Sequence, residues 1–304
     1  MSLNDLNGKT AIVTGGGSGI SLSFTLRLLE AGCNVVVADL ALSPEADALK
    51  TYTETPKAIF QKTDVTDWAQ LDAAFKTAHE SFGRIDIVCT GAGLSEPVSH
   101  VSKPLQCVNA TNSPIQPKTS FWALKSSTDA QSSSFKVLEI NLHHPIRCTQ
   151  LALDYATRQN SRCSVIMISS AAAQQPGTAI PLYAASKAGI NNFVKSMAPM
   201  EPFKGVRVVA VAPGSVLTPF WASREGWVGE GEWIPMEEVV SAMLAMISQP
   251  EYPGGTVLEI TRGSTRKIEL VNDPGPVSGT GATITNVALP RAEMIGLLST
   301  EYGK

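Results

Sequence analysis

Residues 9–31, KTAIVTGGGSGISLSFTLRLLEA, decide the fold class of this chain. The apolar run from Lys9 to Thr14 predicts a buried strand, and the apolar side chains from Ile20 to Ala31 recur at helical spacing. Between them, Gly15-Gly16-Gly17-Ser18-Gly19 lets the backbone approach a phosphate and exposes N–H groups at the positive end of a helix. This order predicts a nucleotide-binding turn; the alternative is a glycine-rich hairpin loop.

An acidic residue follows at the place where a dinucleotide site needs one. A second strand is expected over 34–38, and it ends in Asp39, twenty residues after Gly19. A carboxylate there accepts hydrogen bonds from the ribose hydroxyls of adenosine and repels a 2′-phosphate. The sequence therefore predicts NAD(H) rather than NADP(H).

The alternation of strands and helices continues along the chain. Asp67 is expected to cap a helix that runs to Phe82 and is closed by Gly83. Further strands are expected over 58–63, 85–90, 164–170, 206–211 and 255–261, and further helices over 135–159, around Tyr183 and over 235–247. This pattern predicts an α/β fold, a Rossmann-like, doubly wound, mainly parallel seven-stranded sheet with helices on both faces.

Tyr183 and Lys187 form a candidate proton-transfer pair. Residues four apart share one face of a helix, and a neighbouring ammonium favours the phenolate, so the tyrosine becomes a better general base. Thirteen residues upstream, Ser170 ends an expected strand and adds a hydroxyl. The alternative is an ordinary amphipathic helix with a solvated lysine and a core tyrosine.

Composition limits the class of protein. The 304 residues carry a net charge of −3, with 17% charged and 43% hydrophobic residues, which gives no argument for nucleic acid or an anionic membrane as partner. Five cysteines without paired spacing and four histidines predict reduced thiols and no metal site. The N-terminus lacks the features of a signal peptide, and no apolar run reaches the roughly 18 residues of a membrane helix. We expect a cytoplasmic protein.

Taken together, the motifs resemble those of the short-chain dehydrogenase/reductase family. They occur in the family's order between residues 8 and 262, and some local runs are similar to hydroxyprostaglandin dehydrogenase and its fungal relatives. The residues that carry the resemblance are Thr14 to Ile20, Asp64, Val65, Gly91, Ala92, Gly93, Asn141, Ser170, Tyr183, Lys187, Pro213, Gly214 and Thr218.

The resemblance implies a role for each of these residues. Ser170 would bind the substrate oxygen, Tyr183 would act as general acid/base, and Lys187 would lower the Tyr183 pKa and hold the nicotinamide ribose. Asn141 would bind a water that relays protons from Lys187. The cofactor residues implied are Gly15, Gly17, Ser18, Gly19, Ile20, Asp39, Asp64, Val65, Gly91, Ala92, Gly93, Tyr183, Lys187, Pro213, Gly214, Val216 and Thr218. Asp64 is open to a second interpretation, as the cap of a turn. Pairing through the Tyr183 helix and the preceding one implies a homodimer or homotetramer.

Two positions depart from the family pattern. Ser21 stands where the cofactor turn usually ends in glycine, and Thr90-Gly91 stands where the family has two asparagines. Ser21 adds a hydroxyl near the expected pyrophosphate and a Cβ at a tightly packed place. These departures give weight to an alternative function, a non-redox isomerase, dehydratase or cyclase on the same scaffold.

Three segments lie outside the family core. Residues 94–134 read as a long loop that either walls a substrate pocket, anchored by Phe121-Trp122, or is a surface insertion. The stretch 220–233 holds three tryptophans where the family has its substrate lid, and Trp221 and Trp227 are assigned to the pocket; the alternative is oligomer packing. Residues 271–304 are expected to be an extension of a single domain over 1–270.

These observations predict an NAD(H)-dependent oxidoreductase. It would interconvert a secondary alcohol and a ketone on an apolar, polycyclic substrate of the kind made in secondary metabolism. The cofactor would carry the hydride and the protein would orient it.

Overall fold

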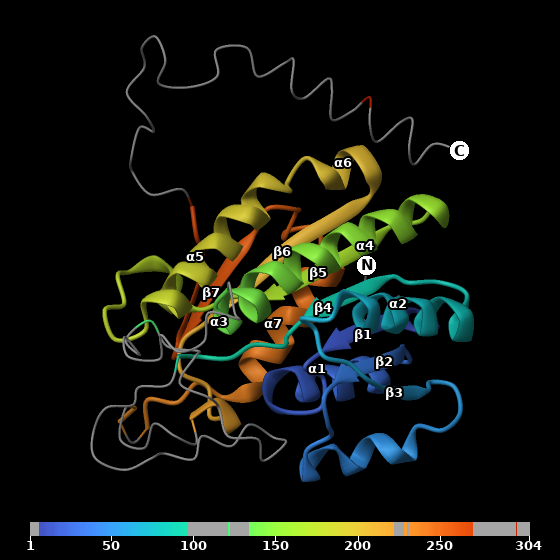
Figure 1. The fold of residues 1–304 in the computed structure, drawn as a ribbon, viewed down its shortest axis with the longest axis horizontal. Coiled ribbons are helices and arrows are strands. Elements are labelled where there is room, and N and C mark those ends of the chain that lie inside the picture. The colour runs from blue at the N-terminus through green and yellow to red at the C-terminus, as the bar shows by residue number, and fades with distance from the viewer. Residues whose placement is uncertain are drawn as a thin grey trace.

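The computed structural model describes residues 6–96, 121, 134–221, 228–229, 231–269 and 296. Within them, one eight-stranded sheet runs in the order β3-β2-β1-β4-β5-β6-β7-β8 (Figure 1). All pairs from β3 to β7 are parallel, and β8 pairs antiparallel with β7. The strands are β1 (Thr10–Thr14), β2 (Asn34–Asp39), β3 (Ala58–Lys62), β4 (Ile87–Thr90), β5 (Cys163–Ile168), β6 (Val206–Pro213), β7 (Val257–Thr261) and β8 (Ser264–Lys267).

Helices cover both faces of this sheet, as predicted. The longer ones are α1 (Gly19–Glu30), α2 (Trp68–Phe82), α4 (His144–Arg158), α5 (Pro181–Ser196) and α7 (Met236–Ser248). Shorter turns of helix are η2 (Pro44–Thr51), α3 (Lys136–Leu138), η4 (Glu139–His143), η5 (Ala171–Gln174), α6 (Met200–Lys204) and η6 (Pro219–Trp221). Asp67 caps α2 by accepting from the N–H groups of Ala69 and Gln70, and Gly83 ends it at φ 74°, as the sequence predicted.

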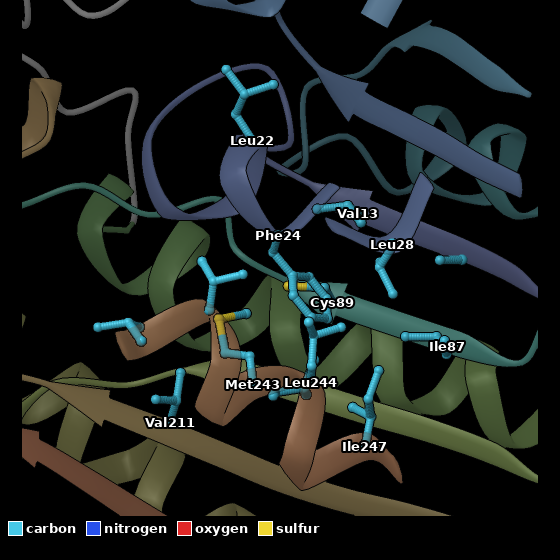
Figure 2. Close-up of a cluster of buried hydrophobic side chains, with 14 of the residues drawn as sticks. Val13, Leu22, Phe24, Leu28, Ile87, Cys89, Val211, Met243, Leu244 and Ile247 are labelled. Atoms are coloured by element: carbon cyan, nitrogen blue, oxygen red, sulfur yellow. The ribbon is translucent and has the colours of Figure 1, made fainter. Parts of the chain in front are cut away.

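Two apolar cores hold the layers together. One joins α1 and α7 to the sheet; in Figure 2, Phe24 and Leu28 of α1 lie near Met243 and Leu244 of α7, over Cys89 of β4. The other joins α2, α4 and α5 to the opposite face. Buried β-branched residues dominate the central strands, which is why their sequences are almost continuously apolar.

The eighth strand was not predicted. β7 and β8 form a hairpin in which Thr261 pairs with Ser264, so only Arg262 and Gly263 connect them. Gly263 takes φ +71°, a conformation that glycine adopts without a steric penalty. Every residue of β8 is exposed, so its sequence shows no apolar alternation from which a strand would be predicted.

The expected helix over 135–159 is three consecutive pieces. The segment η4 has π-helical hydrogen bonding, and α4 begins directly after it with Pro145 in its first turn. Proline has no N–H to donate to the carbonyl four residues earlier, which interrupts the regular ladder at this point. Pro145 therefore marks a helix start, and Asn141 lies inside the π-helical turn.

The topology places a crevice beside the glycine turn. β1 lies between β2 and β4, and Thr14 at its end pairs with both Ala38 and Thr90. The direction of winding changes at this point of the sheet, and ligands of open α/β sheets bind outside the carboxyl ends of the strands there. None of the helices among the described residues is long and apolar enough to span a membrane. The predicted tail, 271–304, lies outside the described residues apart from Gly296, so its role stays a prediction.

Candidate active site

The glycine turn packs against the end of β4. Gly15 takes φ +67°, and a Cβ atom on it would lie 2.6 Å from the backbone nitrogen of Ala92. A side chain at this position would meet backbone, which cannot move away cheaply, and the left-handed φ adds strain. The requirement for glycine here therefore comes from the contact between the β1 and β4 ends, and it brings Gly91–Gly93 beside the turn.

Asp39 bonds directly to the glycine turn. The Gly17 N–H donates to Asp39 Oδ2 at 2.9 Å, and the Leu40 N–H donates to Oδ1 at 2.7 Å. Burial raises the pKa of the Asp39 carboxyl above its usual range, although these N–H donors act in the opposite direction. A Cβ on Gly17 would lie 2.9 Å from Asp39 Oδ2, so only glycine leaves this contact open. The arrangement fits the diphosphate and ribose of a dinucleotide.

The segment after β6 closes on the same turn. A Cβ on Gly19 would lie 3.5 Å from Thr218 Cβ, and Ser18 is the N-cap of α1, whose first two residues are Gly19 and Ile20. Pro213 ends β6, the Gly214 N–H donates to the Ile260 carbonyl at 2.9 Å, and buried Val216 pairs with Ile234. The structure therefore brings the predicted residues from β1, β2, β4 and β6 to one edge of the sheet.

Asp64 has a local structural role. Its Oδ1 accepts from the Thr66 N–H at 2.9 Å and from the Thr66 hydroxyl at 2.8 Å, and the adjacent Val65 is buried. The structure thus shows the predicted turn cap at Asp64, and the contact with the adenosine of a cofactor stays a prediction.

The two departures from the family pattern compensate each other. Ser21 is buried, and its hydroxyl and Cβ occupy the space into which a side chain at position 91 would project. A Cβ on Gly91 would overlap Ser21 Oγ and lie 3.0 Å from Ser21 Cβ. Serine at one position therefore requires glycine at the other. Ser21 packs against the β4 end, which argues against the idea that it disturbs the cofactor turn.

The candidate catalytic residues meet at the end of β5 and the start of α5. The Lys187 ammonium donates to the Ile168 carbonyl at 2.7 Å and lies 5.6 Å from the centroid of the Tyr183 ring. Burial lowers the pKa of Lys187 from 10.5 to about 8. Ser170 is the N-cap of η5, and its Oγ accepts from the Ala172 N–H at 3.2 Å. The strand ends at Ile168 rather than at Ser170, because the chain turns into η5 there.

Asn141 fastens the chain that leaves β4. Its Oδ1 accepts from the Leu94 N–H at 2.9 Å, and its Nδ2 donates to the Leu94 carbonyl at 2.7 Å and to Ser186 Oγ at 3.3 Å. A Cβ on Gly93 would lie 3.5 Å from Asn141 Oδ1 and 3.8 Å from Lys187 Nζ. Asn141 and Lys187 therefore approach the same glycine, although the water relay expected at Asn141 remains a prediction.

A buried histidine, missed as a site residue, connects η4 to the end of β1. His144 Nδ1 lies 2.9 Å from the Ile140 carbonyl oxygen and Nε2 lies 3.0 Å from Thr14 Oγ1. Because a carbonyl only accepts, Nδ1 carries the proton and Nε2 accepts from the Thr14 hydroxyl. Thr14 Oγ1 in turn accepts from the Gly91 N–H at 3.1 Å. Burial lowers the pKa of His144 to about 4, so it is neutral at neutral pH.

Aromatic rings extend away from the candidate catalytic tyrosine. The Phe220 ring lies 5.6 Å from that of Tyr183, Trp221 lies 5.5 Å from Phe220, and Trp233 lies 5.5 Å from Trp221. Trp221 therefore belongs to an aromatic series, in which Phe220 makes the direct contact. The other predicted pocket residue, Trp227, lies outside the described residues, as does Trp122, whereas Phe121 is described.

Comparison with known proteins agrees with this geometry. The family model described as short chain dehydrogenase matches residues 9–229. The 15-hydroxyprostaglandin dehydrogenase (NAD(+)) of Rattus norvegicus is 33% identical over 246 residues, which cover 79% of this chain and 80% of that protein. The L-fucose dehydrogenase of Bos taurus is 30% identical over 272 residues, covering 84% and 89%.

A fungal relative and a solved structure also match. The short-chain dehydrogenase/reductase prx4 of Penicillium roqueforti is 28% identical over 213 residues, covering 70% of this chain and 56% of that protein. The crystal structure of 3-ketoacyl-(acyl-carrier-protein) reductase from Brucella melitensis, complexed with NADH, superposes with a TM-score of 0.66 at 20% identity, covering 85% and 98%. The fold is therefore that of the solved reductase. The family match and the relatives of 30% identity or more show that this chain belongs to the short-chain dehydrogenase/reductase family, the nicotinamide-dependent alcohol dehydrogenases and ketoreductases.

Proposed function

We propose that this protein is an NAD(H)-dependent oxidoreductase that interconverts a secondary alcohol and a ketone, with Tyr183 as general acid/base. The observation that carries the proposal is the position of the Tyr183 ring, 5.6 Å from the Lys187 ammonium on one side and 5.6 Å from the Phe220 ring. A positive charge beside a phenol favours the phenolate, which is the form that accepts a proton from an alcohol.

The neighbouring residues have matching roles. Ser170, two residues after the end of β5, directs a hydroxyl at the substrate oxygen. Lys187 is held by the Ile168 carbonyl at 2.7 Å, so its ammonium is fixed between the end of β5 and α5. The nicotinamide, when bound, exchanges the hydride. In alcohol oxidation, Tyr183 takes the hydroxyl proton; in ketone reduction, it returns one.

Preference for NAD(H) is part of the proposal. Asp39 places a carboxylate at the end of β2, 2.9 Å from the Gly17 N–H, where a 2′-phosphate would meet negative charge. The NAD(+) in the name of the rat relative supports this preference. The residues that would hold the cofactor are those of the glycine turn, Asp39 and the segments after β4 and β6.

The substrate is proposed to be apolar and of the kind made in secondary metabolism. The rings of Phe220, Trp221 and Trp233 follow one another from Tyr183, and aromatic walls of this kind bind flat or polycyclic carbon skeletons better than polar ones. Residues 97–120 and 122–133 lie outside the described residues, so the contribution of the insertion to the pocket stays a prediction.

We further propose a cytoplasmic homodimer or homotetramer whose dehydrogenase domain spans 1–270. Support for a shared interface comes from α5, where Ala185, Ala188, Asn192 and Ser196 form an exposed, uncharged face. Free, buried thiols at Cys33, Cys89, Cys148 and Cys163 agree with a reducing compartment. Light scattering of the purified protein measures the assembly, and a monomer at micromolar concentration would contradict it.

The test of function combines binding and turnover. NADH and NADPH are titrated by energy transfer from tryptophan, and a panel of apolar alcohols and ketones is then assayed with the tighter cofactor. We expect Tyr183→Phe to abolish turnover and leave NADH affinity within about twofold, because only the hydroxyl is lost. Turnover that survives the substitution excludes Tyr183 as the acid/base. Substrate conversion without net change in NADH would instead support the alternative, a non-redox isomerase, dehydratase or cyclase.

A further inference from the structure

The helix that carries Tyr183 begins without a side-chain cap from its own N-cap residue. α5 starts at Pro181, and the N-cap residue Ile180 has an aliphatic side chain that accepts no hydrogen bond. The first N–H groups of a helix have no partner within the helix, and Tyr183 is the third residue of α5. An acceptor from elsewhere is therefore needed at the backbone of the candidate catalytic residue.

Glu96 supplies that acceptor from a distant part of the chain. Its Oε2 accepts from the Tyr183 N–H at 2.9 Å, across 87 residues of sequence. Its Oε1 accepts from the Phe121 N–H at 3.1 Å. Phe121 is thus tied to Glu96 through its backbone N–H, while the predicted role of Phe121-Trp122 as an anchor of a pocket wall stays a prediction.

Burying the Glu96 carboxylate costs free energy, so its buried position needs a physical explanation. Glu96 has 0% of its surface exposed. A buried charge is tolerated where hydrogen bonds replace its water, and a negative charge is most stable at the positive end of a helix. The N-terminus of α5 and two backbone N–H groups provide both conditions.

The segment that brings Glu96 is itself fixed at the active site. Two residues earlier, both backbone groups of Leu94 pair with the Asn141 side chain, at 2.9 and 2.7 Å. Residues 94–96 thus connect the π-helical turn around Asn141 to the first turn of α5. A change at position 96 would be transmitted to Tyr183 directly through its own backbone N–H.

We propose that Glu96 is a positioning residue for Tyr183. It fixes the backbone of Tyr183 in the first turn of α5, and with it the placement of the phenol relative to Lys187 and the substrate. The inference rests on the proposed role of Tyr183 as acid/base and adds a residue that acts through it.

The conservative variant Glu96→Gln separates this role from simple volume. The two N–H donors approach different oxygens of the carboxylate. A glutamine has one oxygen and one NH₂ group, so it turns a donor toward one of the two N–H groups and loses that bond. We expect kcat for reduction of 1-decalone, a bicyclic apolar ketone, to fall about tenfold or more, which corresponds to about 1.4 kcal/mol in the barrier. NADH affinity should stay within twofold and KM within threefold. Glu96→Ala should have the larger effect.

The matched control is Asp67→Asn. Asp67 does the same physical work at the start of α2, accepting from the N–H groups of Ala69 and Gln70. Its substitution should lower the Tm but leave kcat unchanged. A second readout is independent of turnover and uses Glu96→Ala, which removes both acceptor oxygens. Hydrogen exchange of the peptide 180–187 by mass spectrometry should become at least tenfold faster at the Tyr183 amide in Glu96→Ala and unchanged in Asp67→Asn.

Two results would overturn the inference. One is a wild-type kcat in folded Glu96→Ala; the other is unchanged exchange at the Tyr183 amide in the same variant, which can be measured even if 1-decalone is not a substrate. Tyr183→Phe distinguishes failure of the proposed role of Glu96 from failure of the proposed function. If Tyr183→Phe is inactive and Glu96→Ala is normal, only the role of Glu96 fails, whereas an active Tyr183→Phe means that the proposed function fails.

Discussion

The reciprocal packing of Ser21 and Gly91 gives a quantitative test of how the cofactor turn is built. In Gly91→Ala, the new Cβ would overlap Ser21 Oγ and would also lie 3.0 Å from both Ser21 Cβ and the Thr14 carbonyl oxygen. The optimal separation between two non-bonded carbon atoms is about 3.5–4.0 Å, so Ser21 must move. The strain should fall on the start of α1 and on the glycine turn before it.

The magnitude follows from these contacts. Overpacking by one methyl group in a tight interior costs about 1–3 kcal/mol of unfolding free energy. Ser21→Gly alone places glycine inside α1 and costs about 0.5–1 kcal/mol. Independent effects would sum to about 1.5–4 kcal/mol. Glycine at position 21 removes both Ser21 contacts. The double variant should therefore lose only about 1 kcal/mol of unfolding free energy, and the remaining strain comes from the close contact with the Thr14 carbonyl oxygen.

Urea denaturation of the wild type, both single variants and the double variant gives the coupling energy. We expect a favourable coupling of about 0.5–3 kcal/mol, and NADH affinity that falls in Gly91→Ala and recovers in the double variant. Ser21→Gly combined with Gly254→Ala is the control, because Gly254 approaches Glu201 and Ala198 and not Ser21, so these effects should add. Additive stability changes for Ser21 and Gly91 would refute the reasoning.

Three further predictions concern the cofactor, a buried histidine and the aromatic series. Asp39→Ala removes the acceptor of the Gly17 N–H, so NADH affinity should fall about tenfold and the Kd ratio should shift toward NADPH; a wild type that already prefers NADPH contradicts our interpretation of Asp39. Burial lowers the pKa of His144 from 6.5 to about 4. Between pH 6.5 and pH 4, His144 therefore binds a proton in the unfolded chain but not in the folded chain, so the free energy of unfolding should decrease as the pH falls through this range. The loss from pH 7 to 5 is about 2 kcal/mol by linkage, and urea denaturation of His144→Gln, which does not titrate, should show a pH dependence smaller by that amount; an unchanged dependence would disprove the assignment. Phe220→Ala should raise KM about tenfold for a bicyclic ketone and little for a small one, whereas the exposed Trp68→Ala should change neither; equal effects on both ketones would argue against an aromatic substrate wall.

The sequence was sufficient for most of the fold and for the residue types of the site. The strand at 10–14 and α1 are predicted by the spacing of their own apolar residues, and the turn between them by its glycines. All seven parallel strands were predicted from apolar runs. The capping of α2 by Asp67 and Gly83 could also be predicted, because a helix cap depends on residues that are neighbours in the sequence. The exposed strand β8 has no such signal. The family resemblance rested on several motifs in register and was confirmed by the family match over residues 9–229.

Contacts between distant segments could not be predicted in this way. Ser21 and Gly91 were two separate oddities until the close approach of α1 and the β4 end made them one packing event. His144 belongs to none of the sequence motifs, and nothing near it in the sequence indicates that it is buried against the Thr14 hydroxyl.

Glu96 is the clearest example of a contact that only the tertiary structure shows. In the sequence it is one acid at the edge of a long insertion, and a solvated carboxylate would be the ordinary expectation. Its burial at the start of α5 arises only when the chain leaving β4 crosses to the helix that follows β5, over 87 residues. Local periodicity, capping and turn chemistry are written in neighbouring residues, so the sequence by itself determined the elements, their order and the candidate Tyr183–Lys187 pair. Which buried polar groups satisfy one another depends on segments that meet only in the folded chain, and the tertiary structure alone decided it.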